Sequence, residues 1–419
     1  MVIFYFRDLI WSFPVVSLLI VSGGYFSYKE KFFAFRPDRL LRDTVGTLFG
    51  ETQNKRKLLR SVSTALGGTV GVGSIVGVSF CIAVGGAGSI FWMWVSGITG
   101  MALKYAEVFL AVRYRRVLPD GSCVGGAPYA LTACGHPKAA VLFAVFTVAA
   151  SFGVGNLTQI NALAGCASLV GVPKAVCGAI CAVLLVPVLF GGKERIGKVS
   201  ALIVPPAAVL YVLSMLFVIF SNVAAVPSVL ARIFGSAFGI KPVVGGISGT
   251  VIAGAVREGF ARGVFSTEAG VGSSALAHAS YGQSDPVAQG KWGALESFVC
   301  TFLISTLTAF ALLCDGKSSV ISLFSERFGV PGSVFFVVLI AVFAFSSVIS
   351  WCFYGDVCLS FLGIPHAKTV YRLLFVLTSL FGACFSPRLF WALSDILNGF
   401  MMVPNLFLLF LKRKEVLYQ

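Results

Sequence analysis

The segment that decides the fold runs from Gly67 to Gly77 and reads GGTVGVGSIVG. It lies in the middle of an apolar stretch of membrane-spanning length, residues 62–84, and five of its eleven residues are Gly. Each Gly costs a helix interior about 1 kcal/mol. One interpretation is a broken helix that faces a polar site, because lipid cannot satisfy freed backbone groups. The alternative is an intact helix whose glycines allow close packing on a neighbour.

The composition around this segment is that of a membrane protein. The 419 residues are 57% hydrophobic and 12% charged, and the mean hydropathy is +0.92. Such values are typical of an all-α polytopic membrane protein rather than of a soluble domain. Apolar stretches of spanning length predict about 11 transmembrane helices. They lie near residues 9–28, 62–84, 89–112, 139–165, 173–191, 199–221, 246–278, 292–314, 331–355, 370–386 and 389–411.

The net charge of +15 reflects topology rather than nucleic-acid binding. If the loops alternate between the two sides, one side carries 22 of the 32 Lys and Arg residues and the other carries 7. The positive-inside rule then places the N-terminus outside and the C-terminus in the cytoplasm. We therefore expect a multi-pass protein of a bacterial-type plasma membrane. No A-x-A site follows the first segment, which predicts an uncleaved span.

The predicted spans divide into an extra N-terminal helix and two sets of five. We expect an N-terminal helix with a cytoplasmic linker (1–61), a first repeat (62–221), a second repeat (246–411) and a cytoplasmic tail (412–419). Five spans per half force the halves into opposite orientations, which is the geometry of an inverted repeat. Each half also begins with a Gly-interrupted segment, and the second one starts at Gly245-Gly246 and continues to residue 273.

Charged residues inside predicted spans are costly and point to internal partners or to function. In the second Gly-rich segment, Glu258 and Arg262 have the i, i+4 spacing of a helical ion pair. We expect a network that braces this helix, with ligand contact as the alternative. Lys104 and Glu107 predict a pair near the cytoplasmic end of their span, with the lysine reaching the interface.

Uncharged polar residues mark two further spans. The segment from Ser151 to Asn161 contains Asn156 and Gln159 on one helical face, where hydrogen bonds between helices and a binding role are both open. In residues 331–355, the adjacent hydroxyls of Ser346 and Ser347 are plausible oxygen ligands for a hard cation. The alternative is that these serines only bond their own backbone.

Several function classes are disfavoured by the sequence. There is no H-E-x-x-H, G-x-S-x-G or P-loop motif, so neither an enzyme nor an ATP-driven pump is predicted. The three His residues are far apart and no C-x-x-C pair occurs, which predicts no zinc site or other bound cofactor. Paired broken helices fit a closed mid-membrane site better than a continuous channel.

Long motifs in order along the chain resemble the alanine or glycine:cation symporter family. The matching segments are Gly71–Gly77, Gly85–Trp94, Gly100–Glu107, Ser151–Asn161, Ala261–Gly270, Pro286–Gly290, Trp351–Asp356 and Asp395–Gly399. The resemblance implies the LeuT-type fold, a 5+5 inverted repeat, and sodium-coupled symport of alanine or glycine across the lipid bilayer.

The resemblance also implies which residues bind. Sodium would be held by backbone carbonyls at Gly67 and Val70 together with Ser346 and Ser347. The substrate set would be Gly71, Gly73, Ser74, Gln159, Gly263, Ser347 and Trp351.

Four positions depart from the pattern of the resembled family. Val72 and Ser74 stand where the family usually has Thr and Asn, Thr267 also replaces an Asn, and Ser347 replaces the Thr of a Ser-Thr pair. The shorter or apolar side chains remove polar reach at the site. The exact amino acid and the coupling ion therefore stay open, with a proton-coupled transporter or a non-transporting amino-acid sensor as alternatives.

Overall fold

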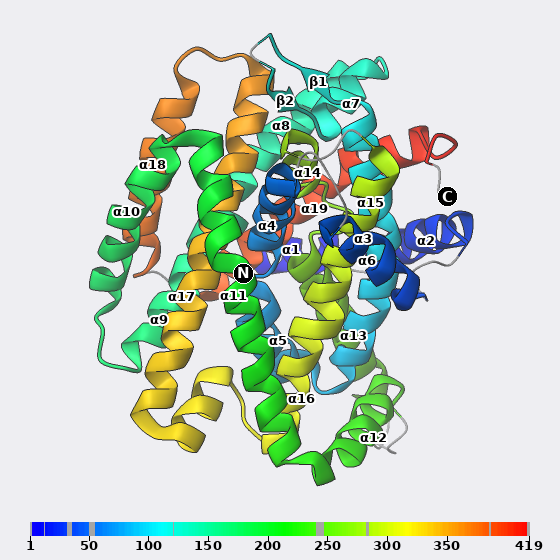
Figure 1. Cartoon of the computed structure of the whole chain (residues 1–419). Coiled ribbons are helices and arrows are strands. Elements are labelled where there is room, and N and C mark those ends of the chain that lie inside the picture. The colour runs from blue at the N-terminus through cyan, green and yellow to red at the C-terminus, as the bar shows by residue number, and fades with distance from the viewer. Residues whose placement is uncertain are drawn as a thin grey trace.

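A computed structural model shows the chain as a bundle of long helices, with one short β-hairpin in the part of the chain that it describes (Figure 1). The described residues are 2–11, 13–31, 36–49, 55–119, 121–239, 247–281, 285–384 and 387–416. The Gly245-Gly246 pair that opens the second Gly-rich segment lies outside these ranges.

The elements fall into two groups on either side of residues 240–246. The first group is α1 (Val2–Ile10), α2 (Phe13–Lys29), α3 (Pro37–Phe49), α4 (Lys55–Thr69), α5 (Val72–Gly85), α6 (Gly88–Arg113), β1 (Arg116–Val117), β2 (Cys123–Val124), α7 (Ala127–Ala133), α8 (Pro137–Phe152), η2 (Gly153–Leu157), α9 (Thr158–Ser168), α10 (Lys174–Phe190), α11 (Gly192–Ser221), η3 (Val223–Ala225) and α12 (Val226–Ala237). The second group is α13 (Ile247–Thr267), α14 (Ala275–Tyr281), α15 (Pro286–Phe298), η4 (Val299–Ser305), α16 (Thr306–Asp315), α17 (Val320–Leu362), α18 (Ala367–Gly382) and α19 (Pro387–Leu411). The segments η2 and η4 are π-helical turns and η3 is a 3₁₀ turn.

Helices lie in each of the eleven ranges predicted as spans. Within the described residues, eight helical segments are both long and apolar enough to cross a membrane. They are Val2–Lys29, Lys55–Gly85, Gly88–Arg113, Pro137–Ser168, Gly192–Ser221, Pro286–Asp315, Val320–Leu362 and Arg388–Leu411. The chain is therefore a multi-pass membrane protein by the length and composition of its helices.

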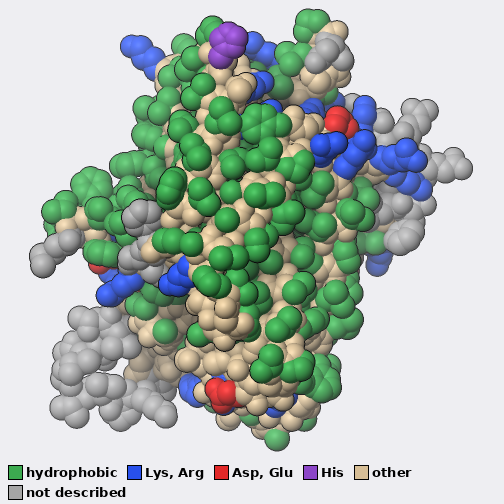
Figure 2. All heavy atoms as spheres, turned by 90° about the vertical axis from the view of Figure 1, so that its left-hand side faces the viewer, with side chains coloured by type: hydrophobic (Ala, Val, Ile, Leu, Met, Phe, Trp, Pro, Cys, Tyr) green, Lys and Arg blue, Asp and Glu red, His purple; other side chains and the backbone are tan. Residues whose placement is uncertain are grey.

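Large apolar side chains are exposed along α10, α11, α17 and α18. Examples are Val183 on α10, Leu202 on α11, Val338 on α17 and Leu373 on α18. Figure 2 shows the side of the molecule where these helices lie, and apolar side chains cover its central belt while charged side chains lie toward the ends and margins. A contiguous apolar face of this kind suits contact with lipid.

The first Gly-rich segment is a broken helix. Helix α4 ends at Thr69 and α5 begins at Val72, and Gly71 between them has φ −126° and ψ −157°. Gly and β-branched residues meet here without a strong helix former, so local propensity does not carry the helix through. The alternative of an intact helix is wrong. Close packing also occurs, because a Cβ on Gly68 would lie 2.4 Å from the Tyr354 hydroxyl.

The second Gly-rich segment breaks near its end, between Thr267 of α13 and Ala275 of α14. Glu268, Gly270 and Gly272 all have positive φ, at 54°, 85° and 81°. Glycine adopts this conformation without steric cost, whereas Glu268 needs support from its surroundings.

Two features of the N-terminal region were not predicted. The linker before residue 62 is partly helical, because residues 29–61 contain α3 and the first two turns of α4. The first predicted span consists of two helices, α1 and α2, with Trp11 between the described parts. Pro14 stands in the first turn of α2, where its missing N–H and fixed φ favour a new helix start.

The predicted Glu258–Arg262 ion pair is wrong. Arg262 turns toward α19, where its guanidinium bonds Asp395 and lies 4.7 Å from the ring centroid of Trp391. Glu258 instead accepts hydrogen bonds of 2.7 and 2.9 Å from Arg7 of α1. Both partners come from other helices. The network therefore connects α13 to α1 and α19 instead of linking two residues of α13.

The predicted interfacial Lys104–Glu107 pair is also wrong. Lys104 is fully buried and its Nζ lies 3.6 Å from Glu296 of α15. Glu107 is buried too, and its carboxylate accepts a 2.8 Å hydrogen bond from Asn405 of α19. Helix α15 packs along α6 at this level, which leaves the lysine no route to an interface.

Candidate functional site

The first break lies against α17 at the two predicted serines. The Ser347 hydroxyl donates to the Gly67 carbonyl oxygen at 2.8 Å, and the Ser346 hydroxyl approaches the same oxygen at 3.4 Å. These side chains are fully buried. Val70 is buried at the break itself, and its N–H donates to the Leu66 carbonyl at 2.6 Å. The arrangement gathers several oxygen donors of the kind that hard cations prefer.

Two further hydroxyls beside this cluster were not predicted from the sequence. A Cβ on Gly67 would lie 3.0 Å from the Ser350 Oγ, so Ser350 borders the same carbonyl region. The Ser350 and Thr64 hydroxyls are buried and have no hydrogen-bond partner among the described residues. The available signal was spacing, because Ser350 follows Ser347 by three residues and therefore shares its face of α17.

Gln159 meets the beginning of α5. Its Oε1 accepts a 3.0 Å hydrogen bond from the Val72 N–H, and its Nε2 donates to the Val154 carbonyl at 3.1 Å. The π-helical turn η2 precedes α9 and shifts the face that Gln159 presents. The first N–H groups of a helix lack partners within the helix and favour negative charge. Gln159 thus occupies a donor that a carboxylate can also bind.

Gly71 lies between the two functional side chains just described. A Cβ placed on Gly71 would lie 2.3 Å from the Ser347 Oγ and 2.9 Å from the Gln159 Oε1. The structure therefore brings Gly71, Gln159 and Ser347 into one closely packed group. Only a residue without a side chain allows this approach.

Ser74 connects the two broken helices. Its hydroxyl lies 2.7 Å from the Ser266 hydroxyl of α13, and it also donates to the Thr69 carbonyl at 3.1 Å. Gly73 faces α13 as well, because a Cβ there would lie 2.4 Å from a ring carbon of Phe265. Ser266 was part of the quoted motif but was not predicted as a site residue, and its contact depends on how α5 and α13 pack.

The remaining two predicted substrate residues are Gly263 and Trp351, which pack against α6 and η2. Gly263 faces α6, and a Cβ there would lie 2.6 Å from the Ser96 Oγ. Trp351 is fully buried against η2, where a Cβ on Gly155 would lie 2.1 Å from the Trp351 Cβ. Its ring also meets Tyr354 edge to face, at 5.5 Å between centroids.

A buried polar chain fixes the second break. Lys104 Nζ donates to the Ser274 hydroxyl at 2.7 Å and faces Glu296. Gln289 Nε2 lies 2.6 Å from His278 Nδ1, and His278 Nε2 lies 2.9 Å from the Glu296 carboxylate. The charges compensate one another inside the bundle, as buried charges require.

Asn156 and Asn161 bond neighbouring helices. Asn156 Nδ2 donates to the Phe375 carbonyl at 2.7 Å, and Asn161 Nδ2 donates to the Gly382 carbonyl at 3.0 Å, both on α18. Of the three amide side chains in this segment, Gln159 alone contacts the first break, and hydrogen bonding between helices accounts for the other two.

A cavity of about 350 Å³ lies at the β-hairpin end of the bundle. Its lining includes Cys123 of β2, Lys193 of α11, Ser280 of α14, Phe353 of α17 and Arg372 of α18. These residues belong to or border the Lys- and Arg-rich loops. The bundle is therefore hollowed on that side of the two breaks.

Two broken helices that meet at a buried polar cluster inside a helical bundle define a membrane transporter. A crystal structure of MhsT in complex with L-phenylalanine shares the fold, with a TM-score of 0.57 and 14% sequence identity over 82% of this chain and 87% of that chain.

Sequence comparison gives the family. A model described as the sodium:alanine symporter family matches residues 1–418. Similar proteins include the sodium/alanine symporter AgcS of Methanococcus maripaludis, 36% identical over 83% of this chain and 80% of the relative. The probable sodium/glutamine symporter GlnT of Bacillus subtilis is 33% identical over 98% and 87%. The chain belongs to the sodium:alanine symporter family, whose function is sodium-coupled amino-acid symport.

Proposed function

We propose that the chain carries small neutral amino acids, alanine or glycine, into the cell together with sodium by alternating access. The observation that carries the proposal is the contact of the Ser347 hydroxyl with the Gly67 carbonyl at the first break, 2.8 Å apart. A broken helix exposes carbonyls at one half and N–H groups at the other, so one break serves both the cation and the substrate carboxylate.

In this proposal the carbonyls of Gly67 and Val70 bind sodium together with Ser346 and Ser347. The Ser347 hydroxyl donates to the Gly67 carbonyl, and the Ser346 hydroxyl, which donates to the Phe343 carbonyl at 2.9 Å, lies 3.4 Å from the same Gly67 oxygen. A cation that enters between these oxygens replaces hydrogen bonds with coordination. The Ser350 hydroxyl, which has no hydrogen-bond partner among the described residues, borders Gly67 and is proposed as a further ligand.

The substrate occupies the other half of the break. Its carboxylate replaces the Gln159 oxygen at the Val72 N–H, and its ammonium group faces the Ser347 hydroxyl. Gly71, Gly73 and Ser74 form one wall, and the Phe265 ring, which packs directly on Gly73, limits the length of the side chain. Gly263 supports α13 against α6, and Trp351 closes the side toward η2.

The topology is part of the proposal. Eleven spans form an N-terminal helix followed by two inverted repeats of five, 62–221 and 246–411, with the N-terminus outside and the C-terminus in the cytoplasm. The excess of Lys and Arg on the β-hairpin side supports this orientation. The cavity on that side supports an inward pathway.

Uptake into proteoliposomes tests the proposal. Labelled alanine, glycine and glutamine are offered with and without an inward sodium gradient, and glutamine is included because one relative is a probable glutamine symporter. Accumulation of alanine or glycine only with sodium supports the proposal. Accumulation driven by a proton gradient alone supports the proton-coupled alternative, and binding without accumulation supports a sensor.

Competition tests the size and charge of the pocket. Alanine and glycine are expected to compete for uptake, whereas glutamate, lysine and tryptophan are not. The reason is that the charge of Arg262, which lies beside Phe265, is already compensated by Asp395, so the pocket holds no net charge that would favour a charged side chain. Strong competition by lysine or tryptophan would overturn the pocket assignment.

A further inference from the structure

The N-terminal helix α1 contributes a charge to a buried ion-pair network. Arg7 bonds both carboxylate oxygens of Glu258 on α13, at 2.7 and 2.9 Å. Its Nε also donates to Asp395 Oδ2 of α19 at 2.9 Å, and Arg262 bonds the same oxygen. The side chains of Glu258, Asp395 and Arg262 are at most 1% exposed. The network thus joins three elements far from one another in sequence.

Arg7 of α1 supplies the hydrogen bonds to Glu258 in this network. Arg7 and Arg262 face the carboxylates of Glu258 and Asp395, and the Asp8–Arg257 pair borders them. Without Arg7, a fully buried carboxylate keeps only the more distant Arg257 Nε at 3.7 Å. An unpaired buried charge is strongly unfavourable, so closure of α13 on α19 depends on the docked α1.

Three layers of contacts follow one another along α5 from the first break toward Gly85. The ion-pair network is the third and outermost layer. Gly73 meets Phe265, and Gly77 meets Trp391, whose ring carbon would lie 3.4 Å from a Cβ there. Gly85 meets Glu258, whose Cβ would lie 3.1 Å away. The glycines of α5 therefore let α13 and α19 close tightly over the break.

Arg262 connects these layers. Its guanidinium carbon lies 5.3 Å from the ring of Phe265, 4.7 Å from that of Trp391 and 5.8 Å from that of Phe80. Phe80 and Trp391 are stacked with centroids 6.1 Å apart. An arginine that stacks on aromatic rings and bonds a carboxylate couples the ion pairs to the aromatic layer below them.

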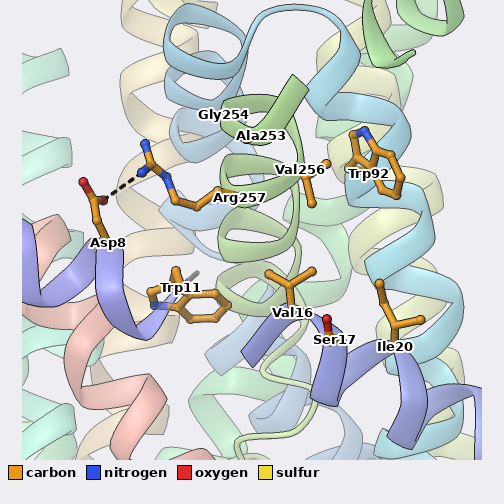
Figure 3. A pocket seen from close by; sticks show the side chains of 10 residues that line it. All are labelled: Asp8, Trp11, Val16, Ser17, Ile20, Trp92, Ala253, Gly254, Val256 and Arg257. Atoms are coloured by element: carbon orange, nitrogen blue, oxygen red, sulfur yellow. Dashed lines mark ion pairs between the residues drawn. The ribbon is translucent and has the colours of Figure 1, made fainter. Parts of the chain in front are cut away.

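A cavity of about 610 Å³ separates the N-terminal segment from α13 beside this network (Figure 3). Trp11 and Val16 line it from one side and Val256 from the other, and the Asp8–Arg257 pair, 3.4 Å apart, lies at its edge. Because close apolar packing is interrupted here, the charged groups hold the two elements together. The cavity also leaves room for α13 to move once they separate.

We propose that α1 acts as a latch on a gate over the first break. The gate consists of α13 and α19 where they pack on α5, and the latch is the set of bonds from Arg7 that holds them there. Arg7 is a positioning residue: it holds α13 and α19 together, and its release opens the side of the bundle at which α5 ends. The inference rests on the proposed function, because a gate serves the transport cycle. The claim itself is that Arg7 stabilises the closed state of this gate.

Cys81 of α5 provides a native reporter of this gate. It is fully buried, one turn before Gly85, and is close enough to Glu258 and Arg262 to interact with their charges. In a background where the four most exposed cysteines are changed to Ser, labelling by a maleimide reports opening near the latch. Those four are Cys123, Cys134, Cys314 and Cys384.

The test measures the labelling rate of Cys81 in lipid nanodiscs, without amino acid, so that it does not depend on uptake. Arg7→Gln is expected to label roughly tenfold faster than the background, because the closed population falls when the latch is lost. Arg7→Lys keeps the charge but not the fork that bridges two carboxylates, and an intermediate rate is expected. The matched control Arg327→Gln, which removes a part-buried arginine–aspartate pair outside the network, is expected to label like the background.

Two outcomes would overturn the latch. One is an unchanged Cys81 rate in Arg7→Gln. The other is equally fast labelling of the remaining buried cysteines when Cys81→Ser is added to Arg7→Gln, which would show general loosening instead of gate opening. If Arg7→Gln speeds the labelling of Cys81 as expected but the protein shows no sodium-driven uptake, the result counts against the proposed function alone.

Discussion

At the residue scale, the first break places oxygen atoms where a side chain would otherwise stand. Gly67 and Gly71 approach α17 and α9 so closely that a Cβ at either position would meet the Ser350, Ser347 or Gln159 oxygens within 3.0 Å. Glycine at these positions therefore sets the size of the site as well as the break in the helix.

Removing one hydroxyl of the cluster tests the sodium assignment. Ser347→Ala is expected to raise the sodium concentration needed for half-maximal uptake by about tenfold, because loss of one oxygen partner costs about 1–3 kcal/mol. Ser360→Ala is the control, since Ser360 on the same helix only donates to the Asp356 carbonyl. Wild-type sodium dependence in Ser347→Ala would refute the assignment.

Enlarging Gly73 tests the wall toward α13. Gly73→Val is expected to abolish uptake while the protein still elutes as a folded species, because its Cβ would press on the Phe265 ring from 2.4 Å. Gly165→Val is the matched control on α9, since no heavy atom lies within 4 Å of a Cβ at that position. Full uptake by Gly73→Val would show that this wall does not border the substrate.

At the element scale, each broken helix is held by partners from several other helices. The first break is held by α17 and α9, and the second by α6, α15 and α19. Lys104 of α6 reaches Ser274 in the second break, and Asn405 of α19 donates to the Gly270 carbonyl at 2.9 Å. Such partners satisfy the backbone and side-chain groups that the break frees inside the bundle.

Removing the buried cation beside the second break is expected to destabilise the fold. Lys104→Met leaves Glu296 without its amine partner, a loss of about 3–5 kcal/mol for a broken buried pair. The apparent melting temperature in detergent measures the effect. Lys291→Met removes an exposed pair with Asp43 and is expected to cost at most about 1 kcal/mol. A melting temperature of Lys104→Met equal to that of the Lys291→Met control would contradict this role.

The breaks could be predicted from the sequence because their cause is local. Runs of Gly lower helix propensity whatever surrounds them. Ser346 and Ser347 could be predicted as oxygen ligands because they are adjacent hydroxyls inside a predicted span. The partners of charged residues could not be predicted, because they depend on which helices become neighbours. Arg7 and Glu258 are 251 positions apart, and no local spacing rule connects them. The i, i+4 spacing therefore predicted Arg262 as the partner of Glu258, whereas the packing of the helices makes Arg7 its partner.

At the scale of the whole molecule, the two sides of the bundle differ. The side with the β-hairpin has a cavity of about 350 Å³ and the surplus of Lys and Arg. On the other side, aromatic rings and the Arg7 network cover the first break. The cavity of about 610 Å³ on this second side is lined by none of the residues of the first break, so the break stays covered there. Alternating access requires such a covered side in one of its states.

The orientation of these two sides in the membrane gives the last prediction. If the loops between the eleven proposed spans alternate, 22 of the 32 Lys and Arg residues lie on the β-hairpin side and 7 on the other, and the β-hairpin side is expected to face the cytoplasm. A reporter fused after Gln419 should give a cytoplasmic signal, and one placed before Met1 an external signal. The same reporter inserted in the loop after Asp315 should also read external, as a check that does not involve either terminus. Both termini on one side would reject the eleven-span arrangement, because an odd number of crossings separates the ends of the chain.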